Sequence, residues 1–136
     1  MMADAIYDGA NIDGVEVKKY DLKFTTITEI ATETIDAAVL AVGSPTLNKG
    51  LMPKVAENLT YLKGLSPKGK GAIAFGSYGW AKKGGPHQVL DYLKEMDCEI
   101  LLEEPIQSQF VPTDEILEEC RKAGQMLAEK ALISQV

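Results

Sequence analysis

The apolar run AAVLAVG, residues 37–43, decides the fold. Seven consecutive apolar or small residues are typical of a strand that is buried on both faces. A second run of the same kind, GAIAFG, covers residues 71–76. Strands buried on both faces belong to parallel sheets with helices on either side. The two runs therefore predict the centre of a three-layer α/β sandwich.

The segments around these runs alternate between helical and extended patterns. Apolar residues at helical spacing predict five helices. Three lie over residues 2–13, 26–35 and 53–64, and a fourth carries Val89, Leu90, Leu93 and Met96 on its inner face. Thr113 can cap the last helix, whose buried face extends from Ile116 to Ala131. Residues 15–20 alternate apolar and polar side chains and predict an edge strand, and residues 98–102 and 106–111 are predicted to be extended. The alternating order of these helices and strands predicts an α/β fold with a parallel sheet, in a single domain over residues 1–136.

Composition narrows the classes of function. The chain has 136 residues, of which 46% are hydrophobic, and a net charge of −6, which disfavours nucleic-acid binding. No apolar run approaches the roughly 20 residues of a membrane span, and the first residues do not resemble a secretory signal. Cys98 and Cys120 lack metal-type spacing and are interpreted as free thiols of a reducing, cytoplasmic compartment.

Two long loops follow the two apolar runs. In open parallel sheets, ligands bind beyond the carboxyl ends of the strands, so these loops are the candidate binding site. They read SPTLNKGLMP, residues 44–53, and SYGWAKKGG, residues 77–85, which contains the only tryptophan, Trp80. A large aromatic side chain in a Gly-rich loop favours stacking on a flat ligand. The alternative is that Trp80 folds back over the domain or contacts another protein.

At these residues the sequence resembles a known family. SPTLNKGLMP, followed by FGSYGW, resembles the flavodoxin-like domain of flavo-diiron proteins, also called A-type flavoproteins. The flanking stretches GVEVKKYDLK and EEPIQSQFVPTDEILEECRKAGQMLAEK agree with it, so the match covers nearly the whole chain. The resemblance implies a flavodoxin-like fold that binds FMN and transfers electrons to or from a redox partner protein.

The resemblance also implies which residues hold the flavin ring. The first loop would hold one edge of the ring and the second loop its other side, with Trp80 or Tyr78 flanking it. No residue need be catalytic, because the cofactor supplies the redox chemistry. The implied cofactor-binding residues are Ser44, Pro45, Thr46, Leu47, Asn48, Ser77, Tyr78, Gly79 and Trp80.

The sequence departs from the family at its N-terminal end. The family begins with a strand and a hydroxyl-rich loop that binds the FMN phosphate, whereas residues 2–6 already resemble the inside of the first helix. We therefore expect an N-terminally incomplete domain that binds FMN weakly or not at all. Without that strand, residues 39–42 would be left with an open edge. Either residues 15–20 move to pair with this edge or, as we expect, a second copy or another partner covers it.

The sequence also bears on three other readings: a metal-dependent reductase, a fragment without a cofactor and a phospho-acceptor domain. The di-iron centre of the family lies in a separate domain, and the single histidine, His87, cannot rebuild it, so neither a metal site nor oxygen or nitric oxide reduction is expected of this chain alone. A second hypothesis is a truncated, cofactor-free fragment that acts as an assembly or interaction module, or is inactive. A phospho-acceptor receiver domain is excluded, because the strand ends do not offer its Asp and Lys.

Overall fold

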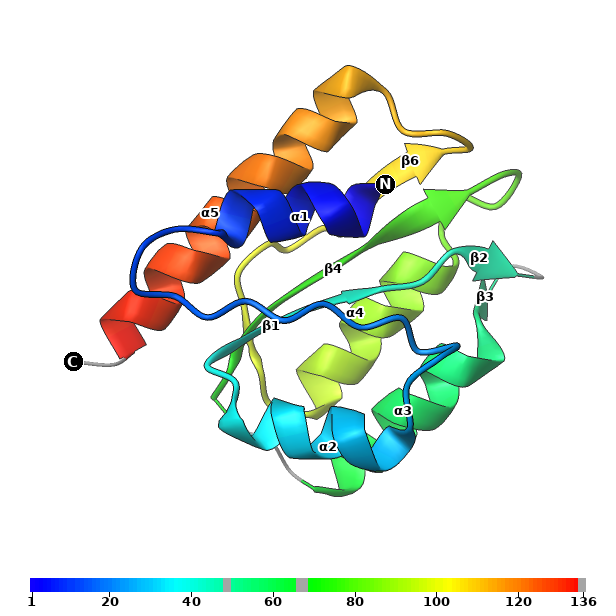
Figure 1. Cartoon of the computed structure of the whole chain (residues 1–136). Coiled ribbons are helices and arrows are strands. Elements are labelled where there is room, and N and C mark those ends of the chain that lie inside the picture. The colour runs from blue at the N-terminus through cyan, green and yellow to red at the C-terminus, as the bar shows by residue number, and fades with distance from the viewer. Residues whose placement is uncertain (48–49, 66–68, 135–136) are drawn as a thin grey trace.

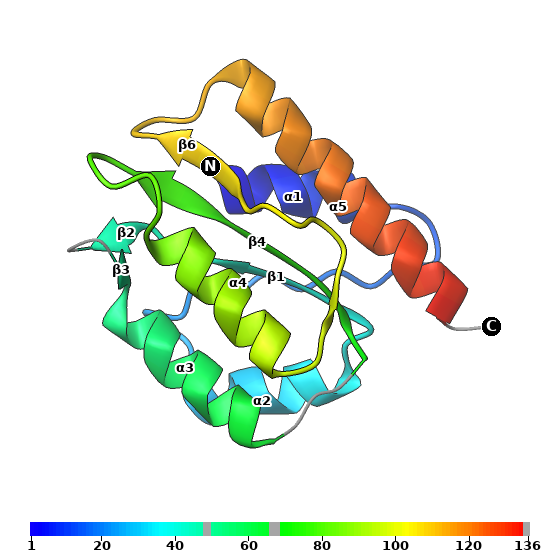
Figure 2. The same ribbon diagram turned by 180° about the vertical axis from the view of Figure 1, so that it is seen from behind.

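The computed structural model describes residues 1–47, 50–65 and 69–134 and places a parallel sheet between two layers of helices (Figure 1). Helices α1 and α5 cover one face of the sheet, and α2, α3 and α4 cover the other (Figure 2). The elements, in chain order, are α1 (Met2–Ala10), α2 (Ile27–Asp36), β1 (Val39–Gly43), β2 (Thr46–Leu47), β3 (Gly50–Leu51), α3 (Pro53–Gly64), β4 (Gly71–Tyr78), α4 (Gly85–Glu95), β5 (Glu99–Ile100), β6 (Ile106–Gln109) and α5 (Asp114–Ser134).

The sheet is centred on β4, which is paired on both sides. On one side β1 runs parallel to it, with Val39 opposite Gly71 and Gly43 opposite Phe75. On the other side β5 pairs with the first residues of β4, and β6 pairs with its second half. The predicted three-layer sandwich with a parallel sheet is therefore confirmed.

Two apolar layers fill the space between the sheet and the helices. Leu59, Val89 and Leu93 are among the buried residues of the layer under α2, α3 and α4. Ile73 and Leu127 are among those of the layer under α1 and α5. Alternate residues of β4 point into opposite layers, which explains why its sequence is apolar throughout.

Local signals set several helix ends. Thr26 caps α2, since its hydroxyl accepts a hydrogen bond from the amide of Glu29 at 3.2 Å. Pro53 occupies the first turn of α3, where its missing N–H costs no hydrogen bond. Thr113 accepts from the amide of Ile116 at 3.3 Å, which confirms its predicted role as the cap of α5. No helix within the described ranges combines the length and apolarity that a membrane crossing requires.

Two strand predictions need correction, and one pair of strands was missed. Residues 15–20 form no strand, and within the described part of the chain no backbone hydrogen bond joins them to β1. Alternation predicted a strand there, but a strand also needs a hydrogen-bonded neighbour, which this segment lacks. The strand expected over residues 98–102 is limited to Glu99–Ile100. The small antiparallel pair of β2 and β3 inside the first long loop was not predicted.

Candidate functional site

The carboxyl ends of β1, β4 and β6 meet at one edge of the sheet, and the two long loops leave from there (Figure 1). The loop after β1 begins at Ser44, and the loop after β4 begins beyond Tyr78. Because all three strands are parallel, their loops gather at this edge. The structure therefore brings together the two segments that the sequence predicted as a binding site.

Hydrogen bonds inside the first loop fix its shape. The Ser44 side chain is 2% exposed, and its hydroxyl donates to the Pro45 carbonyl at 2.8 Å. The same oxygen accepts from the amide of Met52 at 3.0 Å, so it joins the two ends of the loop. The amide of Leu51 donates to Oε1 of Gln88 on α4 at 2.9 Å. The Ser44 hydroxyl is thus engaged within the protein, and it acts on the loop backbone.

The start of α4 packs directly on the first loop. The amide of Gly85 donates to Oγ1 of Thr46 at 3.1 Å. A Cβ at Gly85 would overlap the Pro45 carbonyl, and one at Gly84 would overlap the Thr46 side chain. The absence of side chains at these two glycines lets the loops lie in contact. This close approach fixes the position of the first loop relative to α4.

Two exposed aromatic side chains stand beside the second loop. Trp80 is 96% exposed and Phe110 is 58% exposed, and their rings meet edge to face, with centroids 6.0 Å apart and an interplanar angle of 87°. An edge contact leaves the broad faces of the indole free, which is the arrangement that stacking on a flat molecule needs. The indole is therefore not buried elsewhere in the domain.

Phe110 belongs to the site although sequence reasoning did not single it out. Its backbone has φ of 58°, which is uncommon for a residue other than glycine. Its amide donates to the Tyr78 carbonyl at 2.9 Å, and the side chain of Gln109 donates to the Gly79 carbonyl at 3.2 Å. These bonds attach the end of β6 to the second loop. The only sequence signal was an aromatic residue after a predicted extended segment.

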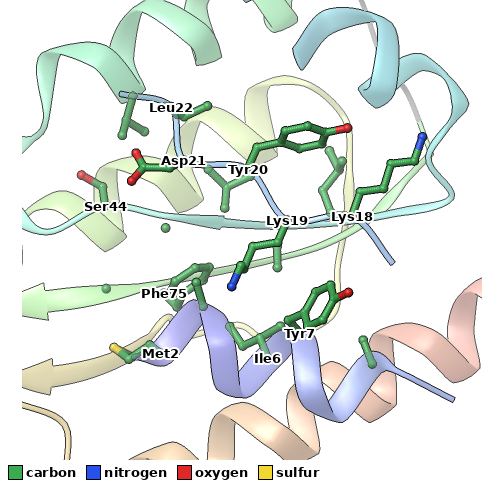
Figure 3. Close-up of a pocket in the computed structure, with 18 of the residues that line it drawn as sticks. Met2, Ile6, Tyr7, Lys18, Lys19, Tyr20, Asp21, Leu22, Ser44 and Phe75 are labelled. Carbon is green, nitrogen blue, oxygen red and sulfur yellow. The ribbon is translucent and has the colours of Figure 1, made fainter. Parts of the chain in front are cut away.

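A cavity of about 1350 Å³ opens at this edge and continues along β1 between the two helix layers. Ser44, Gly76, Ser77 and Phe110 line it at the strand ends. Along β1 it is lined by α1 and residues 15–23 (Figure 3), together with residues of α2, α3 and α5. Most of the lining surface is apolar, and Ser44 and Ser77 add hydroxyl groups where the cavity meets the loops.

The predicted binding residues are only partly brought together. Ser44, Pro45 and Ser77 line the cavity, whereas Thr46 binds α4 and Leu47 is exposed on β2. Tyr78, Gly79 and Trp80 continue the second loop beyond the cavity lining. Asn48 lies outside the described residues. The assignment of these nine residues to cofactor binding stays a prediction.

Cysteine and metal chemistry take little part in this site. Among the described residues, no three His, Cys, Asp or Glu side chains are grouped as metal ligands would be. Cys98 and Cys120 are free and buried, and burial raises the pKa of both thiols, that of Cys120 to about 11. Both lie in the helix-packed layers away from the two loops.

We expect the native chain to resist thiol labelling at pH 8. The thiolate is the reactive form, and a raised pKa together with burial leaves almost none of it accessible. Native protein should incorporate less than about 0.1 equivalent of iodoacetamide in an hour, as measured by mass spectrometry, whereas protein in denaturant should incorporate two. One cysteine fully labelled in the native protein would contradict this expectation.

The raised pKa of Cys120 also makes stability depend on pH. The unfolded thiol loses its proton near its ordinary pKa of 9.0, before the folded thiol does, so the folded state holds more protons between pH 9 and 11. The contribution to stability is therefore full below pH 9 and is lost as the pH rises to about 11. The loss should be on the order of 2 kcal/mol in denaturant titrations.

Several known proteins are similar to this chain in sequence. The family model described as Flavodoxin matches residues 1–124. Nitric oxide reductase of Moorella thermoacetica is 38% identical over 130 residues, which cover 95% of this chain and 32% of that protein. The chain thus spans about a third of the length of the curated relatives it matches.

Solved structures agree with the sequence relatives. The crystal structure of the flavodiiron protein from Giardia intestinalis superposes with a TM-score of 0.91 at 37% identity, over 97% of this chain and 32% of that chain. A flavodoxin from the domain Archaea gives a TM-score of 0.83 at 29% identity, and there the match covers 96% of this chain and 88% of the other. The fold is therefore shared with free-standing flavodoxins as well as with one region of longer proteins.

Proposed function

This chain belongs to the flavodoxin family, as a flavodoxin-like domain of the flavo-diiron type, and from that premise we propose that it binds FMN for electron transfer. The observation that carries the proposal is the exposed indole of Trp80 beside a cavity at the carboxyl edge of the sheet. Such an edge is where parallel α/β sheets bind their ligands.

The residues present fit the ring of a flavin. Trp80 and Phe110 offer exposed aromatic surface, and Ser44, Pro45 and Ser77 border the cavity beside them. The hydroxyls of Ser44 and Thr46 are bonded inside the protein, so the polar rim of a ring would be held mainly by backbone groups of the loops. When bound, the cofactor would supply reversible acceptance and release of electrons.

The chain's own contribution is binding and tuning. An aromatic face and a net charge of −6 disfavour additional negative charge on a bound ring, and so lower its reduction potential. The exposed position of Trp80 leaves the site open to a redox partner protein. We place the domain in a reducing, cytoplasmic compartment, which suits its two free cysteines.

We do not assign to this chain alone the activities for which its longer relatives are named. The names of the relatives refer to nitric oxide reductase and rubredoxin-oxygen oxidoreductase, and this chain covers about a third of each. Our proposal is that the domain alone carries electrons and reduces neither nitric oxide nor oxygen. If the chain binds no flavin, the second hypothesis, an interaction module without a cofactor, takes its place.

Titration with FMN and with riboflavin tests whether the chain binds flavin and whether, as expected, it binds the FMN phosphate only weakly. Added FMN should lose fluorescence on binding in a saturable way, since an aromatic side chain in contact with the ring quenches it. If the ring supplies most of the binding energy, riboflavin should bind within about threefold of FMN, which differs from it only by the phosphate. FMN that binds at least tenfold more tightly would show that this chain has a phosphate site, and no quenching of either would refute flavin binding.

Trp80 should contribute strongly to flavin binding. Trp80→Ala removes the exposed indole, and we expect FMN affinity to fall about tenfold, which corresponds to roughly 1.4 kcal/mol of stacking. Phe24→Ala is the matched control, because Phe24 is also an exposed aromatic, at 80%, but lies in the segment before α2. Fluorescence titration should give the control the parent affinity, and an equal loss in both variants would contradict the assignment.

A further inference from the structure

The outer edge of β1 carries backbone groups without a partner strand. The amide of Gly71 donates to the Ala38 carbonyl at 3.3 Å, and the amide of Ser44 donates to the Phe75 carbonyl at 3.1 Å. In a parallel pair, alternate residues bond to the same neighbour, so Val39, Ala41 and Gly43 direct their N–H and C=O groups away from β4. Within the described residues no strand lies on that side of β1.

The cavity runs along this free edge. Residues 15–20 form its far side and run in the same direction as β1 (Figure 1), without a backbone hydrogen bond to it in the described part of the chain. Apolar side chains close it from both layers: Met2 and Ile6 of α1 on one side (Figure 3), and Ile30 of α2 on the other. The space is therefore bordered as an interior strand would be, by a neighbour on each side and a helix layer on each face.

Two lysines that line the cavity, Lys18 and Lys19, are already paired with carboxylates of the protein. Nζ of Lys18 lies 2.7 Å from a Glu33 carboxylate oxygen. Lys19 pairs with Asp4 and so connects residues 15–20 to α1 across the opening. This pair is exposed and is readily exchanged for water. An occupant of the cavity consequently needs apolar side chains on both faces and no charge of its own.

We propose that an extended apolar segment of another polypeptide adds a strand between β1 and residues 15–20, parallel to β1. Its backbone would pair with Val39, Ala41 and Gly43, and its alternate side chains would enter the two apolar layers. A folded second copy is the poorer candidate, because the free strand edge of its described sheet, that of β1, lies inside its own cavity, behind residues 15–20 and between the two helix layers. The added strand would cover an edge that otherwise favours aggregation. The proposal is independent of flavin binding.

A peptide with the uncharged sequence of residues 71–76, GAIAFG, is a suitable probe. It corresponds to the first six residues of β4, a strand that is paired on both sides and mostly buried, as the cavity requires of its occupant. Fluorescently labelled peptide should bind the full chain saturably in anisotropy titrations. Amide exchange measured by NMR should slow at least tenfold at Val39, Ala41 and Gly43, and change less at Leu40 and Val42, whose amides face β4.

Two controls test whether binding is strand pairing. The same peptide, N-methylated at its central amides, keeps its side chains but cannot pair, and should bind at least tenfold more weakly. Ala41→Pro removes one N–H on the free edge and should weaken the unmodified peptide about as much, with an unchanged circular dichroism spectrum. If that variant does not fold, the N-methylated peptide alone tests whether binding depends on strand pairing.

Three results would overturn the proposal. The first is no saturable binding of the unmodified peptide. The second is binding of the N-methylated peptide within twofold of the parent, which would mean that apolar contact alone holds it. The third is concentration-dependent self-association in sedimentation experiments with the β1 edge protected in the absence of peptide, which would assign the edge to a second copy.

Discussion

Replacing Gly124 with alanine is expected to lower the free energy of unfolding by about 2 kcal/mol, although alanine is the better helix former. Gly124 lies inside α5 where α1 crosses it, and a Cβ there would overlap the carbonyl of Ile6 and meet the amide of Ala10 at 2.9 Å. Both neighbours are backbone of α1, so the helix itself must shift. Overpacking of this kind costs about 1–3 kcal/mol and exceeds the propensity gain of up to about 1 kcal/mol.

Gly64→Ala is the matched control for this prediction. Gly64 ends α3, and apart from its chain neighbours and the backbone of its own helix, no atom of the described residues lies within 4 Å of the position its Cβ would take. Only the helix propensity and the lower entropy of the unfolded chain then remain, and the variant should be more stable by about 0.5–1 kcal/mol. Urea titrations followed by circular dichroism should give the two substitutions opposite signs. A Gly124→Ala variant as stable as the parent would mean that α1 is not packed on α5 as described.

Gly76→Ala is expected to be as damaging, by about 2–4 kcal/mol, and to affect the binding site as well. Gly76 is buried near the end of β4 with φ of 154°, a conformation that residues with a Cβ rarely adopt. A Cβ there would overlap the Ser44 carbonyl and lie 2.8 Å from the Pro86 ring. Relief requires the end of β1 and the start of α4 to move away from β4.

This movement would separate the two loops at the carboxyl edge, so FMN affinity should fall at least tenfold in the variant that still folds. Gly71→Ala is the control, because Gly71 begins the same strand at the end away from the loops, and its Cβ would meet only the ends of the Leu101 and Val39 side chains, at 3.0 and 3.2 Å. We expect less than about 1 kcal/mol of destabilisation there. Urea titration and FMN fluorescence measured on both variants check the prediction, and equal effects of the two substitutions would contradict it.

The fold could be predicted from the sequence because its strands and helices carry local patterns of apolar residues. The runs at residues 37–43 and 71–76 can be buried on both faces only in a helix-covered parallel sheet, and they form the adjacent parallel strands β1 and β4. Helix ends were likewise predictable at Pro53 and Thr113, whose effects act within one turn. The position of the two long loops at one edge of the sheet followed from the parallel order alone.

Contacts between segments that are distant in the sequence could not be predicted in this way. The edge-to-face contact of Trp80 and Phe110 joins residues 30 positions apart, and the bond from Leu51 to Gln88 joins residues 37 apart. Neither leaves a periodic signal, because each depends on where the backbone has already been placed. The positive φ of Phe110 also results from bonds that β6 makes with the second loop.

By itself, the sequence determined that this protein is a parallel α/β domain with its loops gathered beyond the two central strands, since apolar period and chain order are local properties. Only the tertiary structure decided that, among the described residues, residues 15–20 pair with no strand and β1 keeps a free edge beside a mainly apolar cavity. A strand pattern describes which faces can be buried, whereas pairing requires a second backbone at the right distance. That second backbone is a property of the folded arrangement and cannot be read from the pattern.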